Sequence, residues 1–259
     1  MSAIDLFLSP ATDGRRPFIV GHRGASGLAP ENTLSSFSLA IEMGADAIEF
    51  DVHQTSDGHP VVIHDELLDR TTDGKGMVNS TDIKTLRKLD AGSWFSSKFR
   101  GEKVPTLEEA LELVCRNNIA VVEIKHGSEF YEGIEERIVN AVESESRWKE
   151  RTVFIAFNPS LLQKISELDN ELKTGLLIVD PPEEYLEILD DFGITSVFPR
   201  WEKMKAESVH IAHRKGYSVH PWVVDREEDA RKLLELRPDS ISSNYPNMLS
   251  GIIGRSDAS

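Results

Sequence analysis

Two histidines, an arginine and several carboxylates follow short apolar segments within residues 20–65 of the chain. The sequence there reads GHRG at 21–24, PENT at 30–33, EFD at 49–51 and VVIHD at 61–65. Ionisable groups beside a hydrophobic core are costly to bury unless they are paired. Their concentration at the ends of apolar segments therefore predicts a site for metal-assisted acid–base chemistry.

The acidic residues of this predicted site fall on two predicted strands. Glu49 and Asp51 are two positions apart, so on a strand their side chains project from the same face. Their repulsion favours a cation between them, the alternative being a solvated strand end. Glu123, in VVEIK, holds an equivalent position with Lys125 as a same-face partner. Three converging carboxylates predict a hard divalent ion, Mg²⁺ or Ca²⁺.

His22 and His64 are predicted to reach this site by different routes. His22 ends the first apolar segment, whereas TSDG at 55–58 predicts a hairpin that folds His64 back toward Glu49 and Asp51. Because neutral imidazole titrates near ~6.5, the pair can supply one base and one acid. Two histidines beside carboxylates are also compatible with Zn²⁺.

Arg23 and Lys125 are the cations available for an anionic substrate. Arg23 offers a fork of donors suited to phosphate oxygens, and Lys125 adds a point charge. Trp222 faces either the core or the mouth of the site, where it would contact a glycerol or alcohol group. Asn32 or Thr33 is expected to cap the helix that follows PENT.

The bulk composition limits the possible partners. A formal charge of −15 argues against nucleic acid or an anionic membrane surface as a partner. The single cysteine, Cys115, cannot form an internal disulfide. No apolar run approaches the ~20 residues of a membrane span, and residues 1–16 lack the order of a secretory signal. We therefore expect a cytoplasmic protein without stable membrane insertion, with a small-molecule substrate and no indicated oligomeric state.

Eight short segments rich in apolar and β-branched residues alternate with amphipathic helical patterns. These segments are residues 18–22, 47–52, 119–125, 153–157, 175–179, 195–199, 218–224 and 240–243. Continuous apolar strands between helices predict a parallel sheet covered on both faces. Eight such units in 259 residues predict a closed TIM (β/α)8 barrel, with a doubly wound open sheet as the alternative.

Residues 65–105 interrupt this alternation. The segment is polar, carries several turn signals and is too long for an ordinary connection. It predicts a small insertion after the second barrel strand, within a single barrel domain that comprises residues 1–259. Two residue pairs outside this segment have the spacing of helix capping boxes. They are Thr106 with Glu109 and Asp225 with Glu228.

The motifs GHRG, PENT, EFDV, PVVIHD and VEIK, with the turn at 55–58, resemble the glycerophosphodiester phosphodiesterase family in order and spacing. The resemblance extends from residue 20 to SSNYP at 242–246. It departs from the usual pattern at Ala156, at VVD in 223–225 and at Ser243. These departures put the fit of the outer part of the substrate in question.

The resemblance implies a TIM-type barrel with an insertion after the second strand, and it implies roles for individual residues. These are a divalent cation held by Glu49, Asp51 and Glu123, an acid–base pair of His22 and His64, and phosphate binding by Arg23 and Lys125. The implied reaction is hydrolysis of a glycerophosphodiester to glycerol 3-phosphate and an alcohol. The attacking group is either water or the neighbouring glycerol hydroxyl.

Two other functions are compatible with the sequence. Cleavage of lysophospholipid head groups, a lysophospholipase D activity, would need an apolar groove, for which Trp94, Phe95 and Phe99 are available. A barrel that retains its fold as a non-catalytic scaffold would be favoured by the loss of a ligand or a histidine. No such residue is missing from the motifs.

Overall fold

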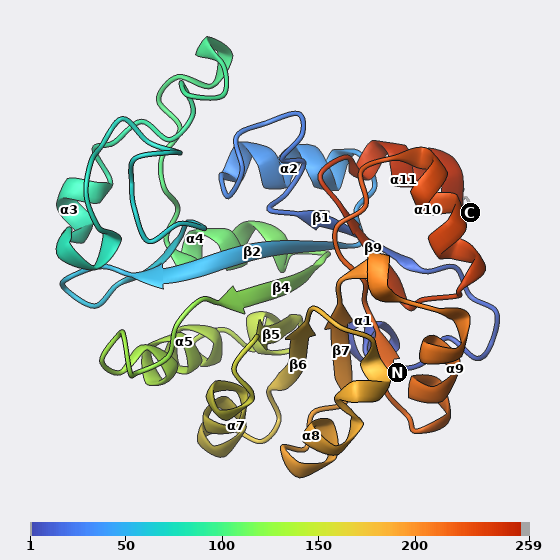
Figure 1. The fold of residues 1–259 in the computed structure, drawn as a ribbon. Coiled ribbons are helices and arrows are strands. Elements are labelled where there is room, and N and C mark those ends of the chain that lie inside the picture. Colours follow the sequence, from blue (N-terminus) through green and yellow to red (C-terminus); the bar gives the residue numbers. More distant parts are fainter. Residues whose placement is uncertain (1, 255–259) are drawn as a thin grey trace.

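Eight parallel strands form a ring at the centre of the protein, and helices surround it (Figure 1). The computed structural model describes residues 2–254. The strands are β1 (Phe18–His22), β2 (Ala47–Gln54), β3 (Pro60–Val62), β4 (Ile119–Ile124), β5 (Thr152–Ala156), β6 (Lys173–Ile178), β7 (Ser196–Pro199), β8 (Ser218–Val219) and β9 (Ser240–Ser243). The helices are α1 (Ala3–Phe7), α2 (Leu34–Glu42), α3 (Ile83–Leu86), α4 (Leu107–Val114), α5 (Ile134–Glu143), α6 (Ser146–Lys149), α7 (Pro159–Leu168), α8 (Leu186–Asp191), α9 (Ala206–Arg214), α10 (Glu227–Glu235) and α11 (Pro246–Ile253).

The strand order is β8-β7-β6-β5-β4-β2-β1-β9, and backbone hydrogen bonds join its two ends. The N–H of Asp239 donates to the carbonyl of Val219 at 2.9 Å. Two further bonds run from Ser242 to Pro221 at 3.1 Å and from Val224 to Ser242 at 2.9 Å. These contacts close the ring, so the predicted TIM barrel is confirmed and the open sheet is wrong.

The strand predicted at 218–224 is shorter in the structure, because β8 ends at Val219. Pro221 lacks the N–H that a continuous strand would donate at that position. The segment nevertheless stays beside its neighbours through an isolated parallel bridge between Arg200 and Trp222. It therefore continues the barrel wall in irregular form.

The hairpin predicted at 55–58 is present. β3 pairs antiparallel with the end of β2, with Val62 opposite Val52 and Val61 opposite His53. The chain after β3 forms the predicted insertion, which extends beyond the end of β2 in Figure 1. Its small apolar core consists of Val61, Ile63, Leu68, Val78, Leu86, Ala91 and Val104.

Helix α1 covers the amino-terminal end of the barrel. Phe7 is fully buried there, meets the edge of Phe18 at 5.3 Å between ring centroids and stacks on His220 at 4.5 Å. Apolar side chains from the barrel interior pack against it. The carboxyl ends of the strands are the end at which enzymes of this fold place their sites.

Two of the predicted helix starts are confirmed. Thr106 caps α4 in a capping box with Glu109, and Thr33 rather than Asn32 caps α2 by accepting the N–H of Ser36 at 3.2 Å. No helix within residues 2–254 is both long enough and apolar enough to cross a membrane.

The capping box predicted from Asp225 and Glu228 is wrong. Arg226 occupies the N-cap of α10 and makes no side-chain cap hydrogen bond. The carboxylate of Asp225 instead accepts the backbone N–H of Asn244 at 2.8 Å and the hydroxyl of Ser243 at 3.1 Å. A contact between the loops after β8 and β9 thus replaces the local cap.

Gly24 should be required for the loop that follows β1. Its φ is +84°, and an added Cβ would lie 2.6 Å from the carbonyl carbon of Ser36. We expect Gly24→Ala to lower the free energy of unfolding by at least ~1 kcal/mol more than Gly193→Ala, as measured by urea denaturation. Gly193 is the matched control, because its φ is +64° but nothing lies within 4 Å of an added Cβ. Equal losses in the two variants would contradict the proposed steric role.

Candidate functional site

Three carboxylates meet at the carboxyl ends of β2 and β4. Asp51 lies opposite Glu123 in the parallel register, and Glu49 precedes Asp51 by two residues. One ligand atom from each lies within 4.8 Å of those of the other two. Asp51 is fully buried and Glu49 is 6% exposed. The structure therefore brings together the three acids predicted as metal ligands.

Two cations balance part of this negative charge. Lys125 Nζ lies 2.6 Å from Glu123 Oε1 and 3.3 Å from Asp51 Oδ1. Arg23 Nε lies 3.3 Å from Asp51 Oδ2, and the backbone N–H of Arg23 donates to Glu49 Oε2 at 2.9 Å. Asn32, which does not cap α2, donates to Asp51 Oδ2 at 2.7 Å. The acids are thus held in fixed positions before any ion binds.

The protonation of the acids reflects their crowding. Burial, reinforced by Asp51 and Glu123, raises the pKa of Glu49 well above its usual value. Burial and then Asp51 raise the pKa of Glu123 to about 7, against the opposing effect of Lys125. Burial also acts on Asp51, but Arg23 and Lys125 outweigh it and lower the pKa of that group. Because Glu49 and Glu123 both resist ionisation, Arg23 and Lys125 do not fully neutralise the cluster.

The donor set fits a hard divalent cation. Carboxylate oxygens are the ligands that Mg²⁺ and Ca²⁺ prefer. Among residues 2–254, Glu49, Asp51 and Glu123 form the sole cluster of three or more acidic, histidine or cysteine side chains spaced to share an ion, and neither predicted histidine belongs to it. The three carboxylates are therefore compatible with the predicted Mg²⁺ or Ca²⁺.

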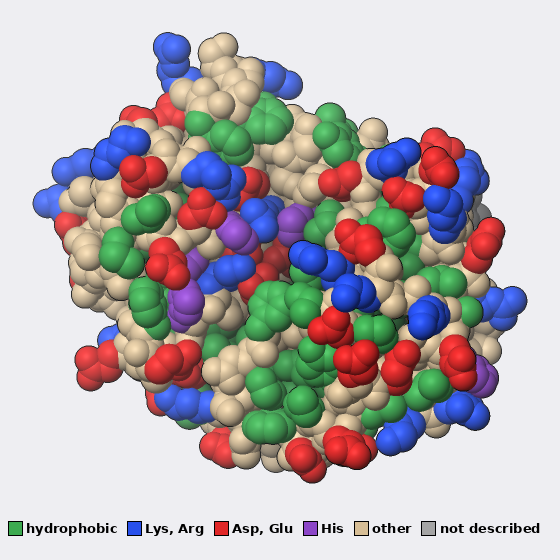
Figure 2. Space-filling view, in the orientation of Figure 1, with side chains coloured by type: hydrophobic (Ala, Val, Ile, Leu, Met, Phe, Trp, Pro, Cys, Tyr) green, Lys and Arg blue, Asp and Glu red, His purple; other side chains and the backbone are tan. Residues whose placement is uncertain are grey.

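Both predicted histidines line one pocket with two of these acids. The pocket has a volume of about 150 Å³ and includes His22, His64, Glu49 and Glu123. On the face shown in Figure 2, histidine, basic and acidic side chains gather around a hollow near the centre. His22 Nε2 lies 3.9 Å from Glu49 Oε2.

The orientation of His22 is set by a loop at the other end of the chain. Its Nδ1 lies 2.7 Å from Asn244 Oδ1, which also accepts the hydroxyl of Ser26 at 2.6 Å. The amide nitrogen of Asn244 donates to Asp225 at 2.5 Å, which fixes the side of the amide that faces His22. Because an amide oxygen only accepts, His22 carries its proton on Nδ1 and leaves Nε2 free. Burial, reinforced by Arg23, lowers the pKa of His22 to about 4.

His64 is held in a similar way by its neighbour in the chain. Its Nδ1 lies 2.6 Å from Asp65 Oδ1, so the proton on Nδ1 faces a carboxylate. His53, which shares a strand face with the acids, does not line the pocket, and its Nε2 lies 2.9 Å from the carbonyl oxygen of His64. His53 therefore supports the backbone that carries His64.

The opposite wall of the pocket is apolar. Ile155, Phe157, Leu177, Phe198 and Trp222 line it. The indole N–H of Trp222 donates to the carbonyl of Phe198 at 2.8 Å, so the ring offers its apolar surface rather than a donor. Of the two positions predicted for Trp222, the structure has the one at the mouth.

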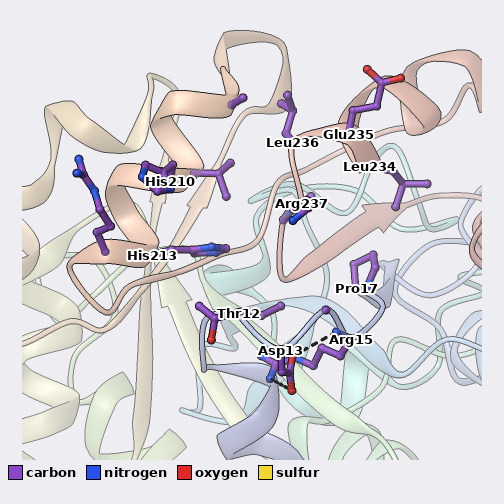
Figure 3. A pocket seen from close by; sticks show the side chains of 16 residues that line it. Thr12, Asp13, Arg15, Pro17, His210, His213, Leu234, Glu235, Leu236 and Arg237 are labelled. Atoms are coloured by element: carbon purple, nitrogen blue, oxygen red, sulfur yellow. Dashed lines mark hydrogen bonds and ion pairs between the residues drawn. The ribbon is translucent and has the colours of Figure 1, made fainter.

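A larger hollow of about 920 Å³ lies at the amino ends of the strands (Figure 3). Two of its polar side chains, His213 and Arg15, are engaged in holding the fold. His213 Nε2 lies 2.8 Å from Asp239, whose carboxylate also accepts the backbone N–H of Val219 at 2.6 Å. Arg15 donates to the carbonyl oxygens of Leu6 and Ser9 beside α1. We assign the chemistry to the smaller pocket at the carboxyl ends.

Three residues that orient the site were not predicted in that role. The sequence predicts Asn32 only as a possible helix cap, and it predicts no separate role for Asp65 or Asn244. The sequence offers a signal for Asp65, because a carboxylate directly after a histidine can orient it. Asn244 contacts His22 across 222 residues of sequence, and no local pattern predicts such a pairing.

A closed βα barrel whose mouth combines buried acids, imidazoles and cations defines an α/β-barrel hydrolase. Comparison with known proteins identifies the family. Residues 22–248 match the model of the glycerophosphoryl diester phosphodiesterase family. The chain belongs to this family, which confirms the resemblance and the prediction that it is an enzyme, a phosphodiesterase.

Individual relatives are similar over nearly the whole chain. A glycerophosphodiester phosphodiesterase from Caldanaerobacter subterraneus subsp. tengcongensis is 38% identical over 243 residues, which cover 92% of this chain and 98% of the relative. One from Bacillus subtilis is 32% identical over 251 residues, covering 90% and 85%. A phosphodiesterase from Oleispira antarctica, solved in complex with the product sn-glycerol-3-phosphate, is 33% identical with a TM-score of 0.82, covering 92% and 97%.

The raised pKa of Glu123 predicts a pH-dependent stability in the metal-free protein. An unfolded glutamate releases its proton near ~4.3, whereas the folded one keeps it to about 7, so the native state binds more protons between these values. The free energy of unfolding should fall as pH rises through this window. Asp51, with its low pKa, stays ionised in both states over most of that range.

Glu123→Gln should show a shallower decline than the wild type in chemical denaturation from about pH 5 to about pH 8, by at most ~3 kcal/mol. Glu132→Gln, which removes an exposed acid outside the pocket, should leave the slope unchanged. Parallel curves for the wild type and Glu123→Gln would refute the assignment.

Proposed function

We propose that the enzyme hydrolyses glycerophosphodiesters, such as glycerophosphocholine or glycerophosphoethanolamine, to glycerol 3-phosphate and an alcohol. Metal dependence and acid–base catalysis by two histidines are part of this proposal. One observation carries it: His22 and His64 line a single pocket with the carboxylates of Glu49 and Glu123. The product bound by the relative from Oleispira antarctica is in keeping with it. The cytoplasmic location remains a prediction from the sequence.

Glu49, Asp51 and Glu123 would hold the divalent cation. When bound, such an ion neutralises the charge of phosphate oxygens and stabilises the charge that develops on them. Arg23 and Lys125 add two fixed positive groups beside it, and both line the pocket. These groups supply a local positive field in a chain whose formal charge is −15.

His22 would act as the general base. Its pKa of about 4 keeps the ring neutral near neutral pH, and the proton on Nδ1 leaves Nε2 free to accept one from the attacking group. That proton comes from the attacking hydroxyl, either of water or of the neighbouring glycerol carbon. In the second case the first product is a cyclic phosphate, which a water molecule must then open to give glycerol 3-phosphate. The new bond forms between that oxygen and phosphorus.

His64 would act as the general acid. Hydrogen bonds from Arg70 and, to a smaller degree, from His64 hold the pKa of Asp65 well below its usual value, so its carboxylate stays charged. That carboxylate accepts the Nδ1 proton of His64 and so fixes the orientation of the ring. His64 would give a proton from Nε2 to the departing alkoxide as the bond from phosphorus to that oxygen breaks.

The apolar wall would receive the carbon portion of the substrate. Trp222 and Phe157 meet edge to face at 6.2 Å, and the side chain of Phe157 is 51% exposed. This wall is also compatible with the lysophospholipase D alternative, because it offers apolar surface to an acyl chain. The aromatic residues Trp94, Phe95 and Phe99, first considered for that role, do not line the pocket.

Removal of the metal should abolish hydrolysis of glycerophosphocholine. We expect activity to return when Mg²⁺ or Ca²⁺ is added to chelated enzyme, measured by release of choline. Glu49→Gln should need at least ~10-fold more metal for half-maximal activity, because it removes a proposed ligand. Glu132→Gln is the control. Full activity after complete chelation would exclude the proposed metal dependence.

Lysophosphatidylcholine, tested in the same assay, separates the enzymatic alternatives. Turnover of the acylated substrate alone would establish the lysophospholipase D activity in place of the proposed one. Turnover of neither substrate with any of Mg²⁺, Ca²⁺ or Zn²⁺ would favour the scaffold.

Loss of either histidine should slow turnover by ~10²–10⁴. The two variants should differ on a glycerophosphodiester with an activated aryl leaving group, which departs without a proton. His64→Ala should regain most of its rate on that substrate, whereas His22→Ala should not. His210→Ala, an exposed histidine on α9, is the control and should keep full activity. The reverse pattern for the two variants would exchange the proposed acid and base.

A further inference from the structure

Arg70, on the inserted segment, makes four hydrogen bonds to two carboxylates that contact residues of the site. Its Nε and Nη2 donate to Asp65 at 2.6 and 2.9 Å. Its Nη1 and Nη2 donate to Glu31 at 2.8 Å each. One guanidinium group therefore binds both acids at once.

Each of these carboxylates also holds a residue of the proposed active site. Asp65 accepts the Nδ1 proton of His64 at 2.6 Å. Glu31 accepts from Nη1 of Arg23 at 2.9 Å. A continuous chain of contacts thus runs from His64 to Arg23 through Arg70, and it joins the proposed acid to the proposed phosphate-binding group.

Stability alone does not explain this arrangement, because the side chain of Arg70 is 43% exposed and solvent screens its ion pairs in part. Geometry does account for it. A planar guanidinium presents five donors in a fixed fork and can bind two carboxylates at once, which a lysine ammonium cannot do with the same directionality.

We infer that Arg70 is a positioning residue, which orients His64 through Asp65 and Arg23 through Glu31. The inference rests on the function proposed for His64 and Arg23. It assigns the insertion a task in the reaction, since Arg70 is the point at which that segment reaches both groups. Removing Arg70 would leave Asp65 and Glu31 facing one another without the cation between them.

The contacts through Asp65 and those through Glu31 should affect different kinetic constants when glycerophosphocholine is the substrate. Asp65→Asn should lower kcat with little change in KM, because it affects the proton donor. Glu31→Gln should mainly raise KM, because it affects phosphate binding. Arg70→Ala should do both, with a loss of ~10–100-fold in kcat/KM and an almost unchanged melting temperature. Guanidinium ion added to Arg70→Ala should restore part of the rate. The Arg70→Lys variant should be less active than Arg70→Ala with added guanidinium ion.

Arg87→Ala is the matched control. Arg87 lies in the same inserted segment and also binds a carboxylate in two places, with Glu109 at 2.7 and 2.6 Å, but the hydrogen bonds of these two residues reach neither His64 nor Arg23. If Arg70 only stabilised the segment, Arg87→Ala would lose as much activity and guanidinium would restore nothing, and that result would overturn the inference. Arg70→Ala with kcat and KM within twofold of an active wild type would overturn it as well. A wild type without phosphodiesterase activity would instead overturn the proposed function.

Discussion

The mutual repulsion of three neighbouring carboxylates, two of them buried and one half-buried, is the constraint around which the site is organised. Asp51 and Glu123 face one another across neighbouring parallel strands, whose spacing is fixed by the hydrogen bonds of the barrel. They cannot separate without opening the barrel wall. Arg23, Lys125 and Asn32 all direct donors at these acids, and yet Glu49 and Glu123 still resist ionisation. The fold thus maintains a shortage of positive charge that a divalent cation would satisfy.

The pocket has two unlike walls, one charged and one apolar. Charged groups occupy the side formed by the ends of β1, β2 and β4, and apolar side chains occupy the side formed by β5, β6, β7 and the segment after β8. A phosphodiester has a charged centre between two uncharged alcohol portions, so it matches such a division. This explains how a chain with a strongly negative formal charge can receive an anion: the positive field is confined to one wall.

Much of this arrangement follows from local sequence rules. Alternation along a strand placed Glu49 and Asp51 on one face, and the turn at 55–58 predicted the return of His64. Contacts between distant segments could not be read in this way. The hydrogen bond between His22 and Asn244 depends on the closure of the barrel, and the same closure draws Asp225 away from its expected place as a helix cap. Local propensity was overridden there by tertiary structure.

His64 is unusual in this site because it arrives on a hairpin that departs from the barrel and not on a barrel strand. Its position depends on the register in which Val62 faces Val52, and that register depends on the number of residues in the turn at 55–58. A single inserted or deleted residue there would rotate the imidazole to the opposite side of the ribbon. Loop tips at the surface commonly accept changes in length. In this enzyme the length of the reverse turn instead sets the position of a proposed catalytic group, so a change in that length would act on the reaction and not only on the surface.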